Sequence, residues 1–125
     1  MLKDNFFSIV KFSTINTNKA SIEIKLNPDH AIFQGHFPNR PITPGVCILQ
    51  IAKELFSSVK VNNYIINKIK NVKFINPIDP NVNSNINYDL DWEESSDGLS
   101  YQIKTVAYFE GTTFCKANMQ LIINK

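Results

Sequence analysis

Cysteine, arginine and histidine are all scarce in this chain of 125 residues. It contains two cysteines, two histidines and a single arginine. Cys47 and Cys115 each lack a second cysteine nearby in the sequence, so they fit reduced, buried packing residues better than a disulfide framework or a metal site. His30 and His36 lack the cysteine or carboxylate companions that zinc sites usually need, and we therefore expect no bound metal.

A large net charge and long apolar runs are also missing. The net charge of +2 is too small to indicate nucleic-acid binding, and Arg40, as the sole arginine, gives little support to bidentate recognition of bases. No apolar run approaches the length of a membrane span, and no amino-terminal stretch combines a basic start with an apolar core. We therefore expect a cytoplasmic protein that binds neither nucleic acid nor membranes.

Length and hydrophobic pattern predict one domain over residues 1–125, whose apolar surface a dimer partner would help to cover. An apolar stretch at residues 46–59 predicts a helix. Alternation of apolar and polar residues predicts strands at residues 6–13, 20–26, 64–75, 82–90, 99–109 and 113–123. The acidic stretch 92–98 is expected to be a solvated hairpin connection.

Proline and glycine, which are few elsewhere, concentrate between residues 33 and 46. This stretch holds three of the six prolines and two of the four glycines, namely Pro38, Pro41, Pro44, Gly35 and Gly45. Such a composition predicts a tightly turned loop of fixed shape. Because the loop leads into the predicted helix, the first N–H donors of that helix can point back at it.

One of the two histidines, His36, lies in this loop. A histidine beside backbone donors is a candidate general base facing a carbonyl oxygen that needs stabilisation. The alternative is a hydrogen-bonded structural histidine. For His30 we expect the structural role, because no residue near it in the sequence supplies a chemical partner.

Polar residues form a single stripe along the predicted helix. Gln50, Lys53, Glu54 and Ser57 have the spacing of one helical face, whereas apolar residues cover most of the remaining circumference. The helix is therefore expected to be enclosed by other elements. The stripe would then face either solvent or, in a helix wrapped by a sheet, a dimer interface and an active-site tunnel.

The order Gly35-His36-Phe37-Pro38, followed by Pro41 and by Pro44-Gly45-Val46, resembles the FabZ/FabA group of 3-hydroxyacyl-acyl-carrier-protein dehydratases. The resemblance is densest over residues 30–55 and extends over nearly the whole chain. It implies the α+β hot-dog fold, in which a curved antiparallel sheet of about six strands wraps around one long central helix. It also implies a homodimer or higher homo-oligomer with active sites at the subunit interface, and a heterodimer with a paralogue is the alternative.

Enzymes of this group eliminate water from a 3-hydroxyacyl thioester and form the trans-2-enoyl thioester. By resemblance, His36 would be the base, the N–H of Gly45 would hold the thioester carbonyl, and Gly35, Phe37, Pro44 and Val46 would shape the substrate site. The substrate would arrive on the phosphopantetheine arm of an acyl carrier protein, without a further cofactor. Core fatty acid biosynthesis and polyketide or aryl polyene biosynthesis would use the same loop.

An acidic carrier protein would need a basic docking surface. Arg40, Lys68, Lys70 and Lys73 could form one. The alternative is that these are ordinary solvated lysines without a partner.

The chain departs from the group at the acid that should protonate the leaving hydroxide. The group has a carboxylate fourteen residues after the histidine, where this chain has Gln50, and an amide cannot release a proton. Glu54 lies one turn further on the same helix face.

Three explanations of the missing carboxylate at position 50 stay open. Glu54 supplies the acid, or Gln50 orients the substrate while His36 and a water carry a slower reaction, or the chain is a non-catalytic acyl-thioester-binding subunit of a heterodimer. An acyl thioesterase of the same fold is a further alternative.

Overall fold

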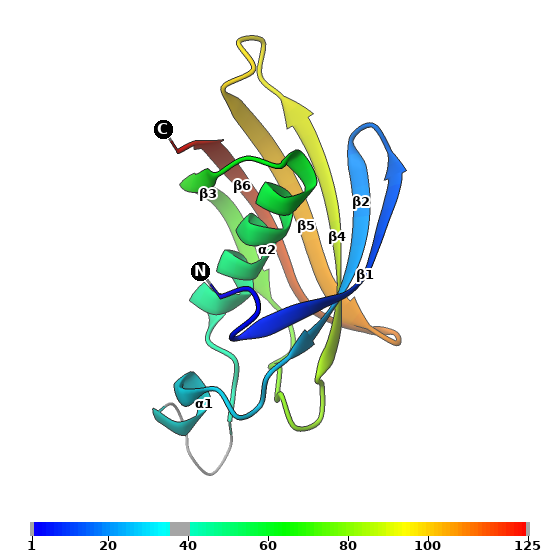
Figure 1. Ribbon diagram of the computed structural model, residues 1–125, viewed down its shortest axis with the longest axis vertical. Helices are drawn as coiled ribbons and strands as arrows, with labels where there is room; N and C mark the ends of the chain where they lie inside the picture. Colours follow the sequence, from blue (N-terminus) through cyan, green and yellow to red (C-terminus); the bar gives the residue numbers. More distant parts are fainter. Residues whose placement is uncertain (1, 36–40, 125) are drawn as a thin grey trace.

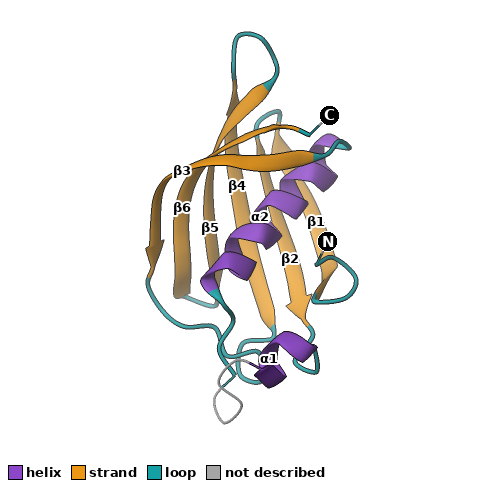
Figure 2. Ribbon diagram, turned by 90° about the vertical axis from the view of Figure 1, so that its left-hand side faces the viewer, coloured by secondary structure: helices purple, strands orange, loops and turns teal. Residues whose placement is uncertain are grey.

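Six strands and two helices follow one another in the computed structural model, which describes residues 2–35 and 41–124. In chain order they are β1 (Phe7–Asn16), β2 (Lys19–Leu26), α1 (Ala31–Gly35), α2 (Gly45–Lys60), β3 (Tyr64–Phe74), β4 (Asn85–Glu94), β5 (Ser100–Phe109) and β6 (Thr112–Ile123). All six strands belong to one antiparallel sheet with the order β1-β2-β4-β5-β6-β3. The sheet curves around α2 (Figures 1 and 2), and this confirms the hot-dog arrangement.

The core lies between the concave face of the sheet and α2. Alternate residues of β2, β4 and β5 point inward and are buried, and the buried positions of α2 begin at Cys47 and continue to Phe56. The ring of Phe56 contacts those of Tyr64, Trp92 and Tyr101 with centroids 5.0–5.5 Å apart. This packing holds α2 in the sheet, as expected for a helix with apolar residues around most of its circumference.

A buried hydrogen bond also fixes α2 to the middle of the sheet. The hydroxyl of Tyr88 in β4 donates to the backbone carbonyl of Ile48 at 2.9 Å. Burial raises the pKa of Tyr88 well above its ordinary value. The phenol therefore remains a donor at physiological pH, and it sets the height of the first turns of α2 over the sheet.

The structure differs from the predictions at the bounds of β4 and in the exposure of part of α2. β4 begins at Asn85 and extends to Glu94, so that the first three residues of the expected hairpin connection belong to the strand. Trp92 pairs with Ile103 and its ring packs on Phe56, which continues the inward-facing pattern past Leu90. The second difference is at Val46, which is 75% exposed in the first turn of α2 although we expected the helix to be enclosed.

The short helix α1 was not predicted. It follows His30, whose carbonyl accepts a hydrogen bond from the N–H of Phe33 at 3.0 Å and whose Nδ1 accepts one from the N–H of Ile32 at 3.1 Å. His30 thus caps the first turn of α1, and this is the structural role that we expected for it. None of the helices in the described ranges is long and apolar enough to cross a membrane.

Candidate active site

The proline-rich loop is described only in part. His36, Phe37, Pro38 and Arg40 lie outside the described residues, so the predicted roles of these residues remain predictions. The backbone of Gly35 ends α1 on one side, and on the other side the chain is described again from Pro41 and reaches α2 at Gly45. The loop therefore connects the end of α1 to the start of α2.

The start of α2 offers backbone donors. Pro44 precedes the helix in an extended conformation and makes no side-chain cap, while its carbonyl accepts hydrogen bonds from the N–H groups of Cys47 and Ile48 at 3.0 and 3.2 Å. Within the described ranges, no acceptor is bonded to the N–H of Gly45 or Val46. These two groups carry the partial positive charge of a helix N-terminus, which suits the binding of a carbonyl oxygen that gains negative charge.

Phe74, a residue that the sequence did not single out, packs directly on Gly45. A Cβ at position 45 would lie 2.6 Å from Cζ of Phe74, so only glycine fits beside the ring as it stands. Phe74 is itself 51% exposed, and the neighbouring apolar side chains of Val46 and Ile75 are exposed as well. The backbone donors of α2 are therefore bordered by an open apolar surface formed by Val46, Phe74 and Ile75.

Strand parity alone misplaces the middle of β3. The pairing of β3 with β6 shifts register between Ile66 and Lys68 and again between Ile69 and Asn71. Each shift changes which face of the sheet the following side chains occupy. Counting alternate residues from Tyr64 therefore gives the wrong face for Ile69, between the two shifts, and the right face again for Phe74.

Gln50 and Glu54 meet on one face of α2, as their spacing predicted. Nε2 of Gln50 donates to Oε2 of Glu54 at 2.8 Å. The carboxylate of Glu54 is buried, with 4% of the residue exposed. Within a single chain, Glu54 lies nine residues from Gly45, or about 14 Å along the axis at about 1.5 Å per residue.

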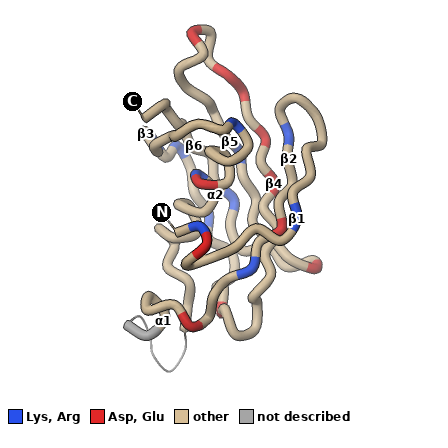
Figure 3. The backbone as a smooth tube through the Cα atoms, viewed as in Figure 1, with Lys and Arg blue, Asp and Glu red and all other residues tan. Residues whose placement is uncertain are grey.

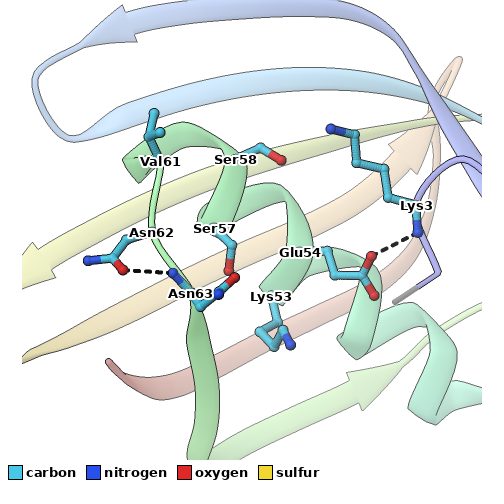
Figure 4. Close-up of a pocket in the computed structure, with 8 residues that line it drawn as sticks. All are labelled: Lys3, Lys53, Glu54, Ser57, Ser58, Val61, Asn62 and Asn63. Carbon is cyan, nitrogen blue, oxygen red and sulfur yellow. Dashed lines mark hydrogen bonds between the residues drawn. The ribbon is translucent and has the colours of Figure 1, made fainter. Parts of the chain in front are cut away.

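Backbone donors from the N-terminal segment complete the surroundings of Glu54. The N–H of Leu2 lies 3.0 Å from Oε1 and 2.8 Å from Oε2, and the N–H of Lys3 donates to Oε1 at 2.8 Å. Figure 4 shows the bond from Lys3. Over residues 2–35 and 41–124 the sole ion pair joins Lys19 and Asp91, so the buried carboxylate is held by neutral donors. Every residue except proline has a backbone N–H group, so the sequence alone could not identify Leu2 and Lys3 as the donors to Glu54.

A polar cavity of about 430 Å³ adjoins Glu54 on the exposed side of α2 (Figure 4). It is lined by Lys3, Lys53, Glu54, Ser57, Ser58, Val61, Asn62 and Asn63. The predicted polar stripe of the helix therefore borders a cavity over part of its length. Gln50 and Lys53 are half-buried rather than fully solvated.

The cysteines are free and buried, as predicted. Burial raises the pKa of the Cys47 thiol, and it raises the pKa of the Cys115 thiol to about 11. Both remain protonated near neutral pH, and neither suits a role as nucleophile or metal ligand. In the described part of the chain, no three histidine, cysteine or acidic side chains are grouped as a metal site would require.

The charged side chains of the sheet are unevenly distributed. Lys68, Lys70 and Lys73 are exposed on β3, and further lysines lie on β5 and β6, whereas acidic residues follow β4 (Figure 3). Lys73 pairs directly with Lys116 of β6. The β3 side of the sheet is thus the basic side, where we expected a carrier protein to dock.

The sequence matches a known family and several curated relatives. Residues 13–116 match the family model of the ApeI-like proteins, described as ApeI dehydratase. The 3-hydroxyacyl-[acyl-carrier-protein] dehydratase FabZ of Gluconobacter oxydans (strain 621H) is 27% identical over 129 residues, covering 94% of this chain and 74% of the relative. FabZ of Escherichia coli O9:H4 (strain HS) is 32% identical over 100 residues, covering 73% of this chain and 64% of the relative.

Solved structures share the fold at low sequence identity. The dehydratase heterocomplex ApeI:P from Xenorhabdus doucetiae superimposes with a TM-score of 0.71 at 19% identity, covering 91% of this chain and 96% of the other. A hypothetical thioesterase with coenzyme A from Streptococcus pneumoniae TIGR4 gives 0.67 at 8% identity, covering 94% and 85%. These likenesses show the fold. The match over residues 13–116 shows the family. The predicted resemblance is confirmed, and the chain belongs to the ApeI-like dehydratase family.

Proposed function

We propose that this protein eliminates water from a 3-hydroxyacyl thioester carried by an acyl carrier protein and releases the trans-2-enoyl thioester. The observation that carries the proposal is the start of α2, where the N–H groups of Gly45 and Val46 have no acceptor in the described part of the chain. They stand at the end of the loop that contains His36. Membership in a dehydratase family and the likeness to FabZ enzymes support the same reaction.

His36 is the proposed base. The α-proton of a thioester is weakly acidic, and its removal sends an electron pair toward the carbonyl, whose oxygen needs hydrogen-bond donors. The N–H of Gly45 supplies one, with Pro44 and Val46 shaping the backbone around it and Gly35 and Phe37 the rest of the loop. The electron pair then forms the carbon–carbon double bond, the bond to the 3-hydroxyl breaks, and hydroxide leaves as water after gaining a proton.

The source of that last proton follows from the surroundings of Gln50. Gln50 occupies the position of the expected acid but can only donate a hydrogen bond to the hydroxyl. The carboxylate of Glu54 already accepts from two backbone N–H groups and from Gln50, and this leaves it little room for a substrate. These contacts favour a route in which Gln50 orients the hydroxyl and His36 returns the abstracted proton to it through a water. A route with Glu54 as acid requires the N-terminal segment to move first.

The proposed site is shared with a second subunit. β3 is an edge strand whose apolar side chains Ile69 and Phe74 are exposed. A second hot-dog chain on this edge would cover them and bring its own helix face to the loop. The partner is a second copy or a paralogue, and the solved ApeI:P heterocomplex is a precedent for a complex of two different chains.

Carrier-protein thioesters test the proposal. The purified protein is incubated with a panel of 3-hydroxyacyl carrier-protein thioesters that includes short and long chains, and enoyl product and free acid are both measured. We expect enoyl product and no free acid, and we expect His36→Gln to abolish turnover with its thermal unfolding unchanged. Free acid as the sole product would instead indicate a thioesterase. Turnover that survives in His36→Gln would rule out the proposed base.

The same assay tests the alternative that the chain is a non-catalytic subunit of a heterodimer. A chain that only binds acyl thioesters gives no product alone and gains activity when a paralogue is added. A working dehydratase turns over alone. Product chain length in the same panel assigns the acyl group, and long polyunsaturated substrates would point to aryl polyene or polyketide assembly rather than core fatty acid biosynthesis.

A further inference from the structure

The segment from residue 2 to the first residue of β1 forms a compact turn that is fixed in the core. We call residues 2–7 the N-terminal turn. The carbonyl of Leu2 accepts hydrogen bonds from the N–H groups of Asn5, Phe6 and Phe7 at 3.2, 2.7 and 3.3 Å. Phe6 and Phe7 are buried in the core. The turn is therefore a built element of the fold.

One end of the N-terminal turn is bonded to the middle of α2. The N–H groups of Leu2 and Lys3 donate to the carboxylate of Glu54 at 2.8–3.0 Å. A buried carboxylate is costly unless donors surround it, so detaching the turn would leave Glu54 with the amide of Gln50 as its remaining described partner. The contact therefore stabilises the turn and the position of both side chains on α2.

The other end of the N-terminal turn contacts α1. The ring of Phe6 stacks on Phe33 with centroids 5.1 Å apart and an interplanar angle of 24°. It also meets the ring of His30 edge-on, with centroids 5.1 Å apart. The carbonyl of Phe6 accepts a hydrogen bond from the N–H of Asn27 at 2.9 Å, which fixes the chain where it approaches α1.

We propose that the N-terminal turn is a brace that fixes α1 relative to the Gln50–Glu54 pair of α2. Glu54 and Phe6 are its two attachment points, and both are positioning residues. The turn connects them without a break: Glu54 to Leu2 and Lys3, Leu2 to Phe6, and Phe6 to Phe33. The catalytic consequence of the brace rests on the proposed dehydration. The chain runs from α1 directly to His36, so in the proposed shared site each brace holds His36 for one site and Gln50 for the other.

The brace also explains why a glutamate stands one turn after Gln50. By accepting from Nε2 of Gln50 at 2.8 Å, Glu54 fixes the rotation of the amide and leaves its carbonyl oxygen and second N–H for other partners. Removing the carboxylate would free the amide and the turn together. Glu54 thus acts through other groups and does not give up a proton itself.

Hydrogen exchange and kinetics on matched variants test the brace. Glu54→Gln removes the charge that attracts the backbone donors, and Phe6→Leu removes the stacking ring while keeping an apolar side chain. Glu93→Gln and Phe12→Leu are the controls, since both residues are exposed and lie outside the turn and the site. In both test variants we expect amide exchange to rise at least about tenfold in residues 2–7 and in α1.

Kinetics then separate the brace from a direct role of Glu54. We expect kcat to fall in Glu54→Gln and in Phe6→Leu alike, by about tenfold or more, because small displacements of reacting groups are that costly. If Glu54→Gln abolishes turnover while Phe6→Leu keeps the wild-type kcat, Glu54 is the acid and the brace is wrong. Unchanged exchange of α1 in Glu54→Gln overturns the brace equally.

The two proposals fail separately. A wild-type protein that converts no 3-hydroxyacyl thioester refutes the proposed function. The exchange experiment needs no turnover, and it still decides whether Glu54 holds the N-terminal turn and α1 in place.

Discussion

Single side chains set the properties of α2 in two places, at Tyr88 beneath the helix and at Gln50 on its outer face. Tyr88 is fully buried with its hydroxyl bonded to the carbonyl of Ile48. Gln50 shares a hydrogen bond with a buried carboxylate. Tyr88 is expected to affect the stability of the protein, and Gln50 its catalysis. The first is tested by denaturation and the second by kinetics.

Replacing Tyr88 by phenylalanine removes the bond to Ile48 and makes the protein less stable. We expect the free energy of unfolding to fall by about 1 kcal/mol at neutral pH, the usual net worth of such a bond. Urea denaturation measures it. A variant as stable as the wild type would show that the hydroxyl does not hold α2.

The same residue predicts a dependence on alkaline pH. Burial raises the pKa of Tyr88, so above pH 10 the unfolded phenol ionises while the folded one stays protonated. The stability that Tyr88 contributes is therefore complete below about pH 10 and is lost as the pH rises further. We expect the wild type to lose stability more steeply than Tyr88→Phe in urea titrations between pH 9 and about 11. Parallel curves would contradict the assignment.

Gln50→Glu restores a carboxyl group at the position where the dehydratase group has its acid. The new group would lie beside Oε2 of Glu54, where Nε2 of Gln50 now lies at 2.8 Å. Two carboxyl groups at that distance cannot both be ionised, so one of them holds a proton that it can give to the leaving hydroxide. We expect kcat for dehydration to rise by about a hundredfold, within the range for general acid catalysis.

Steady-state kinetics on a 3-hydroxyacyl carrier-protein thioester check this, with Gln102→Glu on β5 as the control. An unchanged kcat would mean that proton transfer to the hydroxide does not limit the reaction, and it would remove the reason for assigning Gln50 to the hydroxyl.

The start of α2 and the end of β3 act as a pair of elements. Gly45→Ala would place a methyl group 2.6 Å from the ring of Phe74. The ring or the helix must then move, and a movement of the helix disturbs the backbone donors of the first turn. We expect kcat/KM to fall by about tenfold or more, with a loss of stability of about 1–3 kcal/mol.

Phe74→Ala provides the matching variant for a double-mutant cycle. The methyl group at position 45 has room once the ring is gone, so Gly45→Ala should cost less in the Phe74→Ala background. Additive effects in the cycle would show that the ring does not constrain Gly45.

At the level of elements, the sequence predicts most of the sheet and less of the site. The helix is predicted within one residue of its start because its apolar residues have a helical period, and the strands follow from alternation. The end of β4 fails because Trp92 is buried by contact with Phe56, which lies far away in the sequence. Glu54 and Gln50 are placed on one face by helical geometry alone, but the donors from Leu2 and Lys3 depend on the tertiary fold.

In the whole molecule, β3 is an unfinished edge of the sheet. It pairs with β6 on one side, and Ile69 and Phe74 are exposed near its free side. Edge strands with apolar side chains favour pairing with another chain. We therefore expect particles of two or more chains.

Ile69→Lys is expected to separate the subunits, because it places a charge in the apolar interface. Sedimentation velocity measures the particle mass, and Val10→Lys, an exposed apolar position on the opposite edge strand β1, is the control. We expect Ile69→Lys to sediment as a single chain without dehydratase activity, and Val10→Lys to keep the wild-type mass. A wild type that sediments as one chain, or an active single-chain Ile69→Lys, would contradict a site shared between subunits.

The position of β3 also has a consequence during synthesis. On the ribosome β3 emerges directly after α2, but its neighbour in the sheet is β6, the last strand to be made. Until β6 inserts between β5 and β3, both of these strands present an unpaired backbone edge, and β3 has no strand partner at all. Closure of the sheet is then a late, non-local step, and this interval is when a nascent chain is most exposed to wrong pairing or to capture by chaperones.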